Sequence, residues 1–303
     1  MSAECLSRSC EHRTVSRAIP LLFVFLWSTG FIGAKLGLPY AEPYTFLFIR
    51  LLITSLLLFV CVLVLRKKWP QGWRLNAHIS VSGLLIHGGY LGGVFTAIKL
   101  GMPSGLVALI AGLQPLITAI LAGPLLGEKV SKLQWSGLLM GMAGVSLVLS
   151  EKLDFSNPQL FDGFGLAAVL FSFIAVFSIT ASSLYQKRYC TAMPMMSGTL
   201  VQYAATMILY FFLSLTFETG YVDWNAEFIF SLFWLIFVPS LGGITLLMWM
   251  IKQGQASKVA SLFYLVPPVT AFEAFILFDE KLGIIALAGM GLASVGVWLA
   301  FKK

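Results

Sequence analysis

The chain has 303 residues, of which 58% are hydrophobic and only 11% carry a charged side chain. Water-soluble proteins have roughly a quarter of their residues charged, so this composition excludes an ordinary soluble enzyme or binding domain. The net charge is +7, but the lysines and arginines form no dense basic stripe or tail. No nucleic-acid partner is therefore expected. The charges stand in short clusters between apolar runs, which is typical of a helical protein that crosses a lipid bilayer many times.

The first residues of the chain have the outline of a signal peptide. Residues 1–17 are polar and contain three arginines, and an apolar run begins at Ala18. This run is about 20 residues long, lacks a small-x-small cleavage site and leads into further apolar runs. We therefore predict a cytoplasmic tail at 1–17 followed by a retained first membrane helix.

The rest of the chain divides into further apolar segments, each long enough to cross a hydrocarbon core of about 30 Å as a helix. The connections are short, so no separate soluble domain is expected, and no segment alternates like a barrel strand. The predicted fold class is an all-α polytopic membrane protein. Its ten transmembrane helices are predicted at 18–38, 44–65, 75–98, 103–125, 131–150, 162–184, 195–216, 228–251, 256–278 and 282–301.

The placement of lysine and arginine predicts how these helices are oriented. With the N-terminus in the cytoplasm, fifteen of the twenty Lys and Arg residues fall on the cytoplasmic side. Such an excess marks the cytoplasmic side of membrane proteins, so both termini are predicted to be cytoplasmic. The cysteines fall at or near the same side without metal-type spacing, and neither a disulfide nor a metal site is expected.

The second half of the chain repeats the pattern of the first half. Landmark residues match in the same order: Gly89 with Gly242, Gly101 with Gly254, Pro115 with Pro268, and Gly144 with Gly296. Residues 18–150 and 162–301 are therefore one five-helix unit used twice. Because five is an odd number, the second copy enters the membrane from the opposite side. This is the inverted repeat of many secondary transporters, whose substrate site lies between the two copies.

Four motifs in the first half point to a family. They are WSTGFIGAKLGL at Trp27–Leu38, FIR ending at Arg50, ALIAGLQP at Ala108–Pro115, and LGEK at Leu126–Lys129. In these motifs the chain resembles the EamA-type transporters of the drug/metabolite transporter superfamily, over about residues 18–301. The resemblance implies a central cavity formed by helices one to four and six to nine, with helices five and ten behind. It also implies export of amino acids, other metabolites or drugs; relatives carry nucleotide sugars.

The second half departs from this family pattern at two positions. The sixth helix has no tryptophan to match Trp27, and the seventh has no arginine to match Arg50. Only the first half is therefore expected to supply a cationic contact to the substrate.

Few ionisable side chains fall inside the predicted helices, and an unpaired charge there costs several kcal/mol. Arg50, in the second helix, is predicted to meet a carboxylate or another anionic group, and Lys35 either shares this role or snorkels to the surface. His87 and Tyr90, one turn apart in the third helix, are predicted to face the cavity. Glu273, in the ninth helix, is the candidate for binding a coupling cation or proton. A structural ion pair between Arg50 and Glu273 is the alternative.

Other candidate site residues are aromatic, amide or proline side chains. Trp27 and Tyr264 are predicted to stack on the ligand, and Gln114 to contact it from the ALIAGLQP motif. Three prolines in matching helices are predicted to form a hinge or cavity wall, with a static kink as the alternative. They are Pro115, Pro267 and Pro268.

Small residues recur at helical spacing in three of the predicted helices. Close packing of helices five and ten is predicted from two matching sets, Gly137, Gly141, Gly144 and Gly289, Ala293, Gly296. In helix three, the pairs Gly88-Gly89 and Gly92-Gly93 either pack against neighbours or line a passage.

No enzyme motif is present in the sequence: there is no Walker loop, HExxH, GxSxG or Cys/His ligand set. No catalytic residue, metal or cofactor is expected. We predict a secondary transporter of the inner membrane that exports a small metabolite, an amino acid or similar compound, by alternating access. Proton coupling and the oligomeric state are left open. The alternatives are a carrier of cationic drugs or nucleotide sugars with the same fold, and a channel or lipid scramblase.

Overall fold

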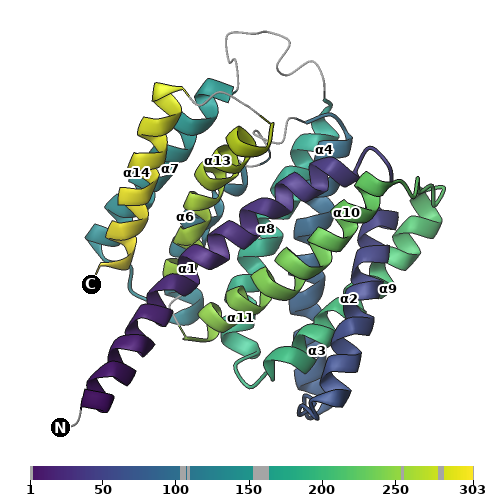
Figure 1. Ribbon diagram of the computed structural model, residues 1–303, viewed down its shortest axis with the longest axis horizontal. Helices are drawn as coiled ribbons and strands as arrows, with labels where there is room; N and C mark the ends of the chain where they lie inside the picture. The colour runs from purple at the N-terminus through teal and green to yellow at the C-terminus, as the bar shows by residue number, and fades with distance from the viewer. Residues whose placement is uncertain are drawn as a thin grey trace.

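The computed structural model describes residues 3–102, 107, 110–152, 164–253, 256–278 and 283–302. Nearly all of these residues are helical (Figure 1). In chain order the helices are α1 (Ala3–Gly37), α2 (Pro43–Val64), α3 (Trp73–Gly83), η1 (Leu84–Leu91), α4 (Gly92–Lys99), α6 (Gln114–Leu126), α7 (Lys132–Lys152), α8 (Leu166–Tyr189), α9 (Met195–Phe217), α10 (Ala226–Leu235), η3 (Ile236–Gly243), α11 (Ile244–Gln253), α12 (Ala256–Ser261), η4 (Leu262–Leu265), α13 (Val266–Phe278) and α14 (Ile284–Phe301).

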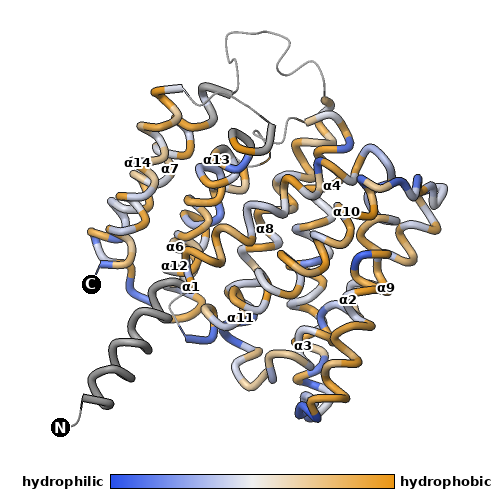
Figure 2. The backbone as a smooth tube through the Cα atoms, in the orientation of Figure 1, coloured by the Kyte–Doolittle hydropathy of each residue, from blue (hydrophilic) through white to orange (hydrophobic). Residues whose placement is uncertain are grey.

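The described helices have the length and composition of a multi-pass membrane protein. Seven helical stretches are apolar and long enough to cross a bilayer: Ile19–Gly37, Pro43–Val64, Trp73–Lys99, Leu166–Tyr189, Met195–Phe217, Ala226–Gln253 and Ile284–Phe301. Shorter apolar helices cover Gln114–Leu126 and Val259–Thr270. Apolar residues run along the helices and polar ones gather at their ends (Figure 2). The prediction of an all-helical, multi-pass membrane protein is therefore confirmed.

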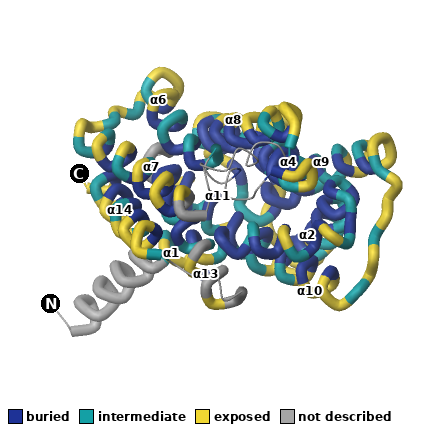
Figure 3. The backbone as a smooth tube through the Cα atoms, turned by 90° about the horizontal axis from the view of Figure 1, so that it is seen from above, coloured by how far each residue is buried: buried dark blue, intermediate teal, exposed yellow. Residues whose placement is uncertain are grey.

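The outer faces of the helices are apolar, as a lipid-facing surface requires. Exposed side chains on α2 include Leu56 and Leu63, and those on α9 include Phe212 and Leu215. Buried residues lie along the inner faces of the helices (Figure 3). The buried polar groups, among them Arg50, are consequently found between helices rather than on the outside.

The two halves of the chain exchange contacts in matching pairs. Helix α1 packs on α10, η3 and α13 of the second half, and its counterpart α8 packs on η1, α4 and α6 of the first half. Helix α2 packs on its own counterpart α9, and α7 packs on its counterpart α14. This is the arrangement expected when one unit is used twice around a pseudo-two-fold axis.

The contact between α7 and α14 is made by backbone atoms. A Cβ atom placed on Gly137 would lie 2.5 Å from the carbonyl oxygen of Gly296, and one on Gly144 would lie 2.4 Å from the nitrogen of Ala293. At these positions only glycine, which has no Cβ, allows the helices to approach this closely. The predicted packing of helices five and ten is confirmed, and Figure 1 shows the pair side by side at one edge of the molecule.

The predicted third and eighth helices each contain a π-helix in their middle. This is η1 between α3 and α4, and η3 between α10 and α11. The alignment that places Gly89 on Gly242 also places η1 on η3, to within one residue. A π-helical turn weakens the regular hydrogen-bond ladder and frees carbonyl groups for other donors. Tyrosines of α9 occupy such carbonyls in both segments: Tyr210 Oη donates to the oxygens of His87 (2.6 Å) and Gly88 (2.9 Å), and Tyr203 Oη donates to that of Ser240 (2.5 Å).

The helices that carry the matched prolines differ from the expected kinked rods. The chain turns at Gly112 and Leu113 before α6 begins, and a 3₁₀ segment, η4, precedes α13. Pro115, Pro267 and Pro268 therefore lie in the first turn of a new helix, where the missing N–H of proline costs no hydrogen bond. Their role as a hinge stays a prediction.

Two loops from different halves are cross-linked at one end of the molecule. The Glu218 carboxylate accepts hydrogen bonds from the backbone nitrogens of Tyr44 (2.7 Å) and Thr45 (2.6 Å), and so caps the N-terminus of α2. In return, Glu42 accepts from the backbone nitrogens of Thr219 (2.9 Å) and Tyr221 (3.2 Å). Between them, residues 41 and 222 form an antiparallel β-bridge. We call Glu42, Glu218 and the segments 40–45 and 218–223 the loop clamp.

Candidate functional site

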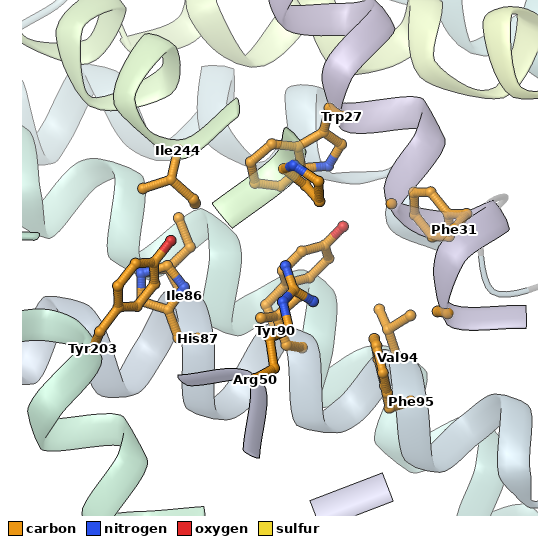
Figure 4. Close-up of a pocket in the computed structure, with 14 residues that line it drawn as sticks. Trp27, Phe31, Arg50, Ile86, His87, Tyr90, Val94, Phe95, Tyr203 and Ile244 are labelled. Atoms are coloured by element: carbon orange, nitrogen blue, oxygen red, sulfur yellow. The ribbon is translucent and has the colours of Figure 1, made fainter. Parts of the chain in front are cut away.

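A cavity with about 530 Å³ of empty space lies between the two halves of the chain (Figure 4). The first half contributes residues of α1, α2, η1 and α4, and the second half contributes α9, η3 and α11. Its wall is mostly aromatic and aliphatic, and three of its side chains carry nitrogen: Trp27, Arg50 and His87. A mostly apolar lining with a few polar groups is typical of a small-molecule site.

Arg50 brings a buried positive charge to this cavity. It comes from α2, its side chain is only 4% exposed, and its Nε donates to Ser240 Oγ of η3 over 2.9 Å. Among the described residues no carboxylate forms an ion pair with this guanidinium. Glu273 is held elsewhere, since its Oε1 accepts a hydrogen bond from Ser28 Oγ of α1 (2.6 Å). The alternative of an Arg50–Glu273 ion pair is therefore wrong.

Ser240 and Tyr203 hold Arg50 in place, and sequence reasoning missed both of them. Ser240 accepts from the guanidinium through its hydroxyl, while its carbonyl accepts from Tyr203 Oη. Both residues are buried and both come from the second half. The two tyrosines of α9, Tyr203 and Tyr210, are two turns apart on one face of the helix, and this spacing is the signal that could have drawn attention to them.

His87 lies beside Tyr203, with the two ring centroids 4.4 Å apart. The imidazole is 1% exposed to solvent and its Nε2 atom has no hydrogen-bond partner. Its backbone is fixed by the bond from Tyr210 to the π-helical carbonyls. A buried nitrogen without a partner is rare in proteins, and this atom is therefore a candidate contact for a ligand that enters the cavity.

Trp27 and Tyr90 stand side by side next to Arg50 (Figure 4). Their rings are nearly parallel, with centroids 6.1 Å apart, and Phe263 packs edge-on against Trp27 at 5.3 Å. Both residues also line a second cavity of about 340 Å³ of empty space, together with Gln114 and Pro267. The Trp27–Tyr90 pair therefore forms a shared wall between the two cavities. Gln114 is buried there, and its Nε2 has no partner.

The remaining predicted site residues lie away from both cavities. Tyr264 is fully buried with its ring against α7, where a Cβ on Gly141 would come within 2.4 Å of it. Pro115 and Pro268 are buried but do not line either cavity. Lys35 is exposed near the end of α1 and does not line them either.

The glycines of the third helical unit pack against neighbouring helices rather than lining the cavities. A Cβ on Gly93 would lie 2.5 Å from the carbonyl oxygen of Phe171 in α8, and one on Gly89 would clash with Ser178 of the same helix. A Cβ on Gly92 would lie 2.9 Å from Tyr210 Oη in α9. The packing interpretation of these glycines is confirmed.

The fold and the cavity between two repeated halves define a membrane transporter for small molecules. The model of the EamA-like transporter family matches residues 18–150 and again residues 166–302. The chain therefore belongs to the EamA-like transporter family, as the four sequence motifs indicated.

Individual relatives agree with this assignment. An uncharacterised transporter, YvbV of Bacillus subtilis, is 27% identical and the match covers 96% of this chain and 93% of the relative. A probable amino-acid metabolite efflux pump of Salmonella typhimurium is 26% identical, with 93% of each chain covered. One solved crystal structure superposes with a TM-score of 0.76 over 94% of this chain and 96% of the other, at 20% identity, which is a likeness of fold alone.

Proposed function

We propose that this protein is a secondary transporter that exports a small carboxylate-bearing metabolite, an amino acid or similar compound, by alternating access. The observation that carries the proposal is the buried guanidinium of Arg50, which opens onto a cavity between the two halves. A cation without a counter-charge is costly within a membrane, and an anionic group of the substrate supplies that charge. The name of the Salmonella typhimurium relative, a probable amino-acid metabolite efflux pump, supports export of this class of compound.

The proposal includes ten membrane crossings in two inverted five-helix units, in the cytoplasmic membrane, with both chain termini in the cytoplasm. It is supported by the lysine and arginine distribution and by the paired contacts between α1 and α8 and their partner helices. In this orientation the loop clamp lies on the outer side of the membrane. Alternating access then requires the loop clamp to break whenever the cavity opens outward.

Glu273 keeps its proposed role as the site of a coupling proton or cation. Its carboxylate is 6% exposed and lies between α13 and α1, with Oε2 unpartnered. Movement of α1 against α13 would change the environment of this carboxylate, and so link its protonation to the transport cycle.

Counterflow in proteoliposomes tests the proposal directly. Vesicles preloaded with unlabelled amino acids and related carboxylates should take up trace label of the same class against its gradient. Vesicles preloaded with a cationic dye should not take up the labelled dye. Saturable counterflow identifies a carrier, whereas a leak that never saturates would establish a channel or scramblase instead. Counterflow of the dye would assign the cavity to cationic drugs.

A further inference from the structure

The inference concerns the charge of the compound that the Arg50 cavity accepts, and it rests on the proposed function. We infer that, among the carboxylate-bearing compounds of the proposed function, the cavity favours a monoanion, a carboxylate attached to a flat apolar body without an ammonium group, over a zwitterionic amino acid, and this narrows the proposed substrate class.

The charge balance of the cavity is the first argument. Arg50 contributes one positive charge, and none of the described residues that line the cavity is acidic. A monoanion brings the net charge of the loaded cavity to zero, a zwitterion leaves it at +1, and a cation raises it to +2. Burying net charge in a low-dielectric interior is strongly unfavourable. The monoanion is therefore the ligand for which loading is easiest.

The polar groups around Arg50 give the second argument. The guanidinium Nε donates to Ser240 Oγ at 2.9 Å, while His87 Nε2, which belongs to the same cavity lining, has no partner. A guanidinium and an imidazole N–H are both donors suited to a carboxylate. An ammonium group is itself only a donor, and beside the guanidinium it meets a charge of the same sign. The described lining residues therefore attract the carboxylate of an amino acid and repel its ammonium group.

The buried carboxylate of Glu273, which could attract an ammonium group, lies outside the cavity. Glu273 Oε1 accepts from Ser28 Oγ, and Glu273 does not line either cavity. An ammonium group attached to the same α-carbon as a carboxylate at Arg50 therefore has no described carboxylate to meet within the cavity.

The aromatic walls give the third argument, about the body of the ligand. Trp27 and Tyr90, stacked on each other, lie beside the guanidinium, and Phe31 and Phe95 extend the apolar wall. An aromatic wall favours packing against a flat apolar group. The compound that satisfies all three arguments is an aryl-alkyl carboxylate.

Three probes that share a phenylethyl group test this inference: 3-phenylpropionate, phenylalanine and phenethylamine. They are respectively a monoanion, a zwitterion and a cation. Binding to the purified full-length protein in detergent is measured by equilibrium dialysis, and counterflow of the same compounds is measured in proteoliposomes. We expect 3-phenylpropionate to bind at least about tenfold more tightly than phenylalanine, because one opposing charge is absent, and phenethylamine to bind most weakly.

Variants connect the preference to Arg50. In Arg50→Gln the preference for 3-phenylpropionate over phenylalanine should disappear, whereas Arg50→Lys should keep the preference with weaker binding, because lysine retains the charge without the planar fork. Arg74→Gln removes an exposed arginine at the start of α3 and should change nothing. The wild-type measurement alone decides the inference if a variant fails to fold.

The outcomes separate this inference from the proposed function. Equal or tighter binding of phenylalanine overturns the inference, even if saturable counterflow shows that the protein is a carrier. Absence of 3-phenylpropionate binding to the wild-type protein also overturns it. The expected binding order without counterflow of any probe upholds the monoanion preference and refutes the transport proposal.

Discussion

Opening of the loop clamp can be tested by removing the Glu218 carboxylate. This carboxylate accepts three hydrogen bonds from Tyr44 and Thr45 at the start of α2. Buried hydrogen bonds to a charged group contribute about 1.5–3 kcal/mol, and about 1 kcal/mol each is appropriate at this partly exposed site. Glu218→Ala should then favour the open clamp by about 3 kcal/mol, or about 100-fold at about 1.4 kcal/mol per factor of ten. Glu218→Gln retains one acceptor oxygen and should have a smaller effect.

The assay measures access to the central cavity from the side of the loop clamp. A cysteine at Gly30, which lines the cavity and has room for a side chain, is introduced after the four native cysteines are replaced by serine. Its rate of labelling by a membrane-impermeant maleimide on intact cells reports the open fraction. Glu218→Ala should raise this rate by about two orders of magnitude.

A disulfide across the β-bridge provides the control. Bridged residues of an antiparallel pair have Cα atoms about 4.5–5.5 Å apart, within the range for a disulfide. The pair Ala41→Cys and Val222→Cys should therefore cross-link under oxidation and suppress the increased labelling, and a reductant should restore it. An unchanged labelling rate in Glu218→Ala, or an increase that survives the cross-link, would refute the role of the loop clamp as a gate.

Three further predictions concern acidity, packing and coupling. Desolvation alone would raise the pKa of Glu42, but the hydrogen bonds from the turn that it caps outweigh this and hold its pKa below the ordinary 4.5. The ionised group therefore stabilises the clamp above that pH. Labelling of the cavity cysteine, divided by that of a fully exposed reference cysteine at the same pH to correct for loss of thiolate, should rise only as the pH falls below 4.5. Gly144→Val should lower the thermal denaturation midpoint by several degrees, at a cost of about 1–3 kcal/mol or more, because a Cβ there lies 2.4 Å from the nitrogen of Ala293. The control Gly291→Val, at a position with open space around it, should leave the midpoint unchanged. Equal midpoints for the two variants would contradict the packing argument. Glu273→Gln should abolish the pH-driven part of transport and leave exchange intact, so loss of both or of neither in a proteoliposome flux assay would remove Glu273 from the coupling role.

Much of the membrane architecture could be predicted because it depends on simple regularities. Apolar segment length, the repeat of glycine and proline landmarks, and the spacing of small residues on α7 and α14 all depend on one helix or one pair of helices. Arg50, His87 and Tyr90 could likewise be selected because ionisable or polar groups are rare inside apolar segments. The structure gathers these three around one cavity.

The parts that could not be predicted depend on contacts between distant segments. Ser240 and Tyr203 are common residue types, and only the approach of the second half to Arg50 gives them a role. Tyr264 is predicted to line the cavity, but its ring packs against Gly141 of α7, where the absence of a side chain leaves space for it. The π-helices depart from the 3.6-residue period on which sequence interpretation depends.

The interface between α7 and α14 has a consequence for the origin of the chain. Gly137 approaches the carbonyl of Gly296, and Gly289 approaches the carbonyl of Gly144, so the contact is reciprocal under the alignment of the two halves. Reciprocity of this kind is the property of an isologous interface, in which two identical subunits meet through the same surface. A half-length polypeptide inserted in both orientations would possess this interface as a homodimer. The present protein thus holds, within one polypeptide, an interface with the symmetry of a homodimer.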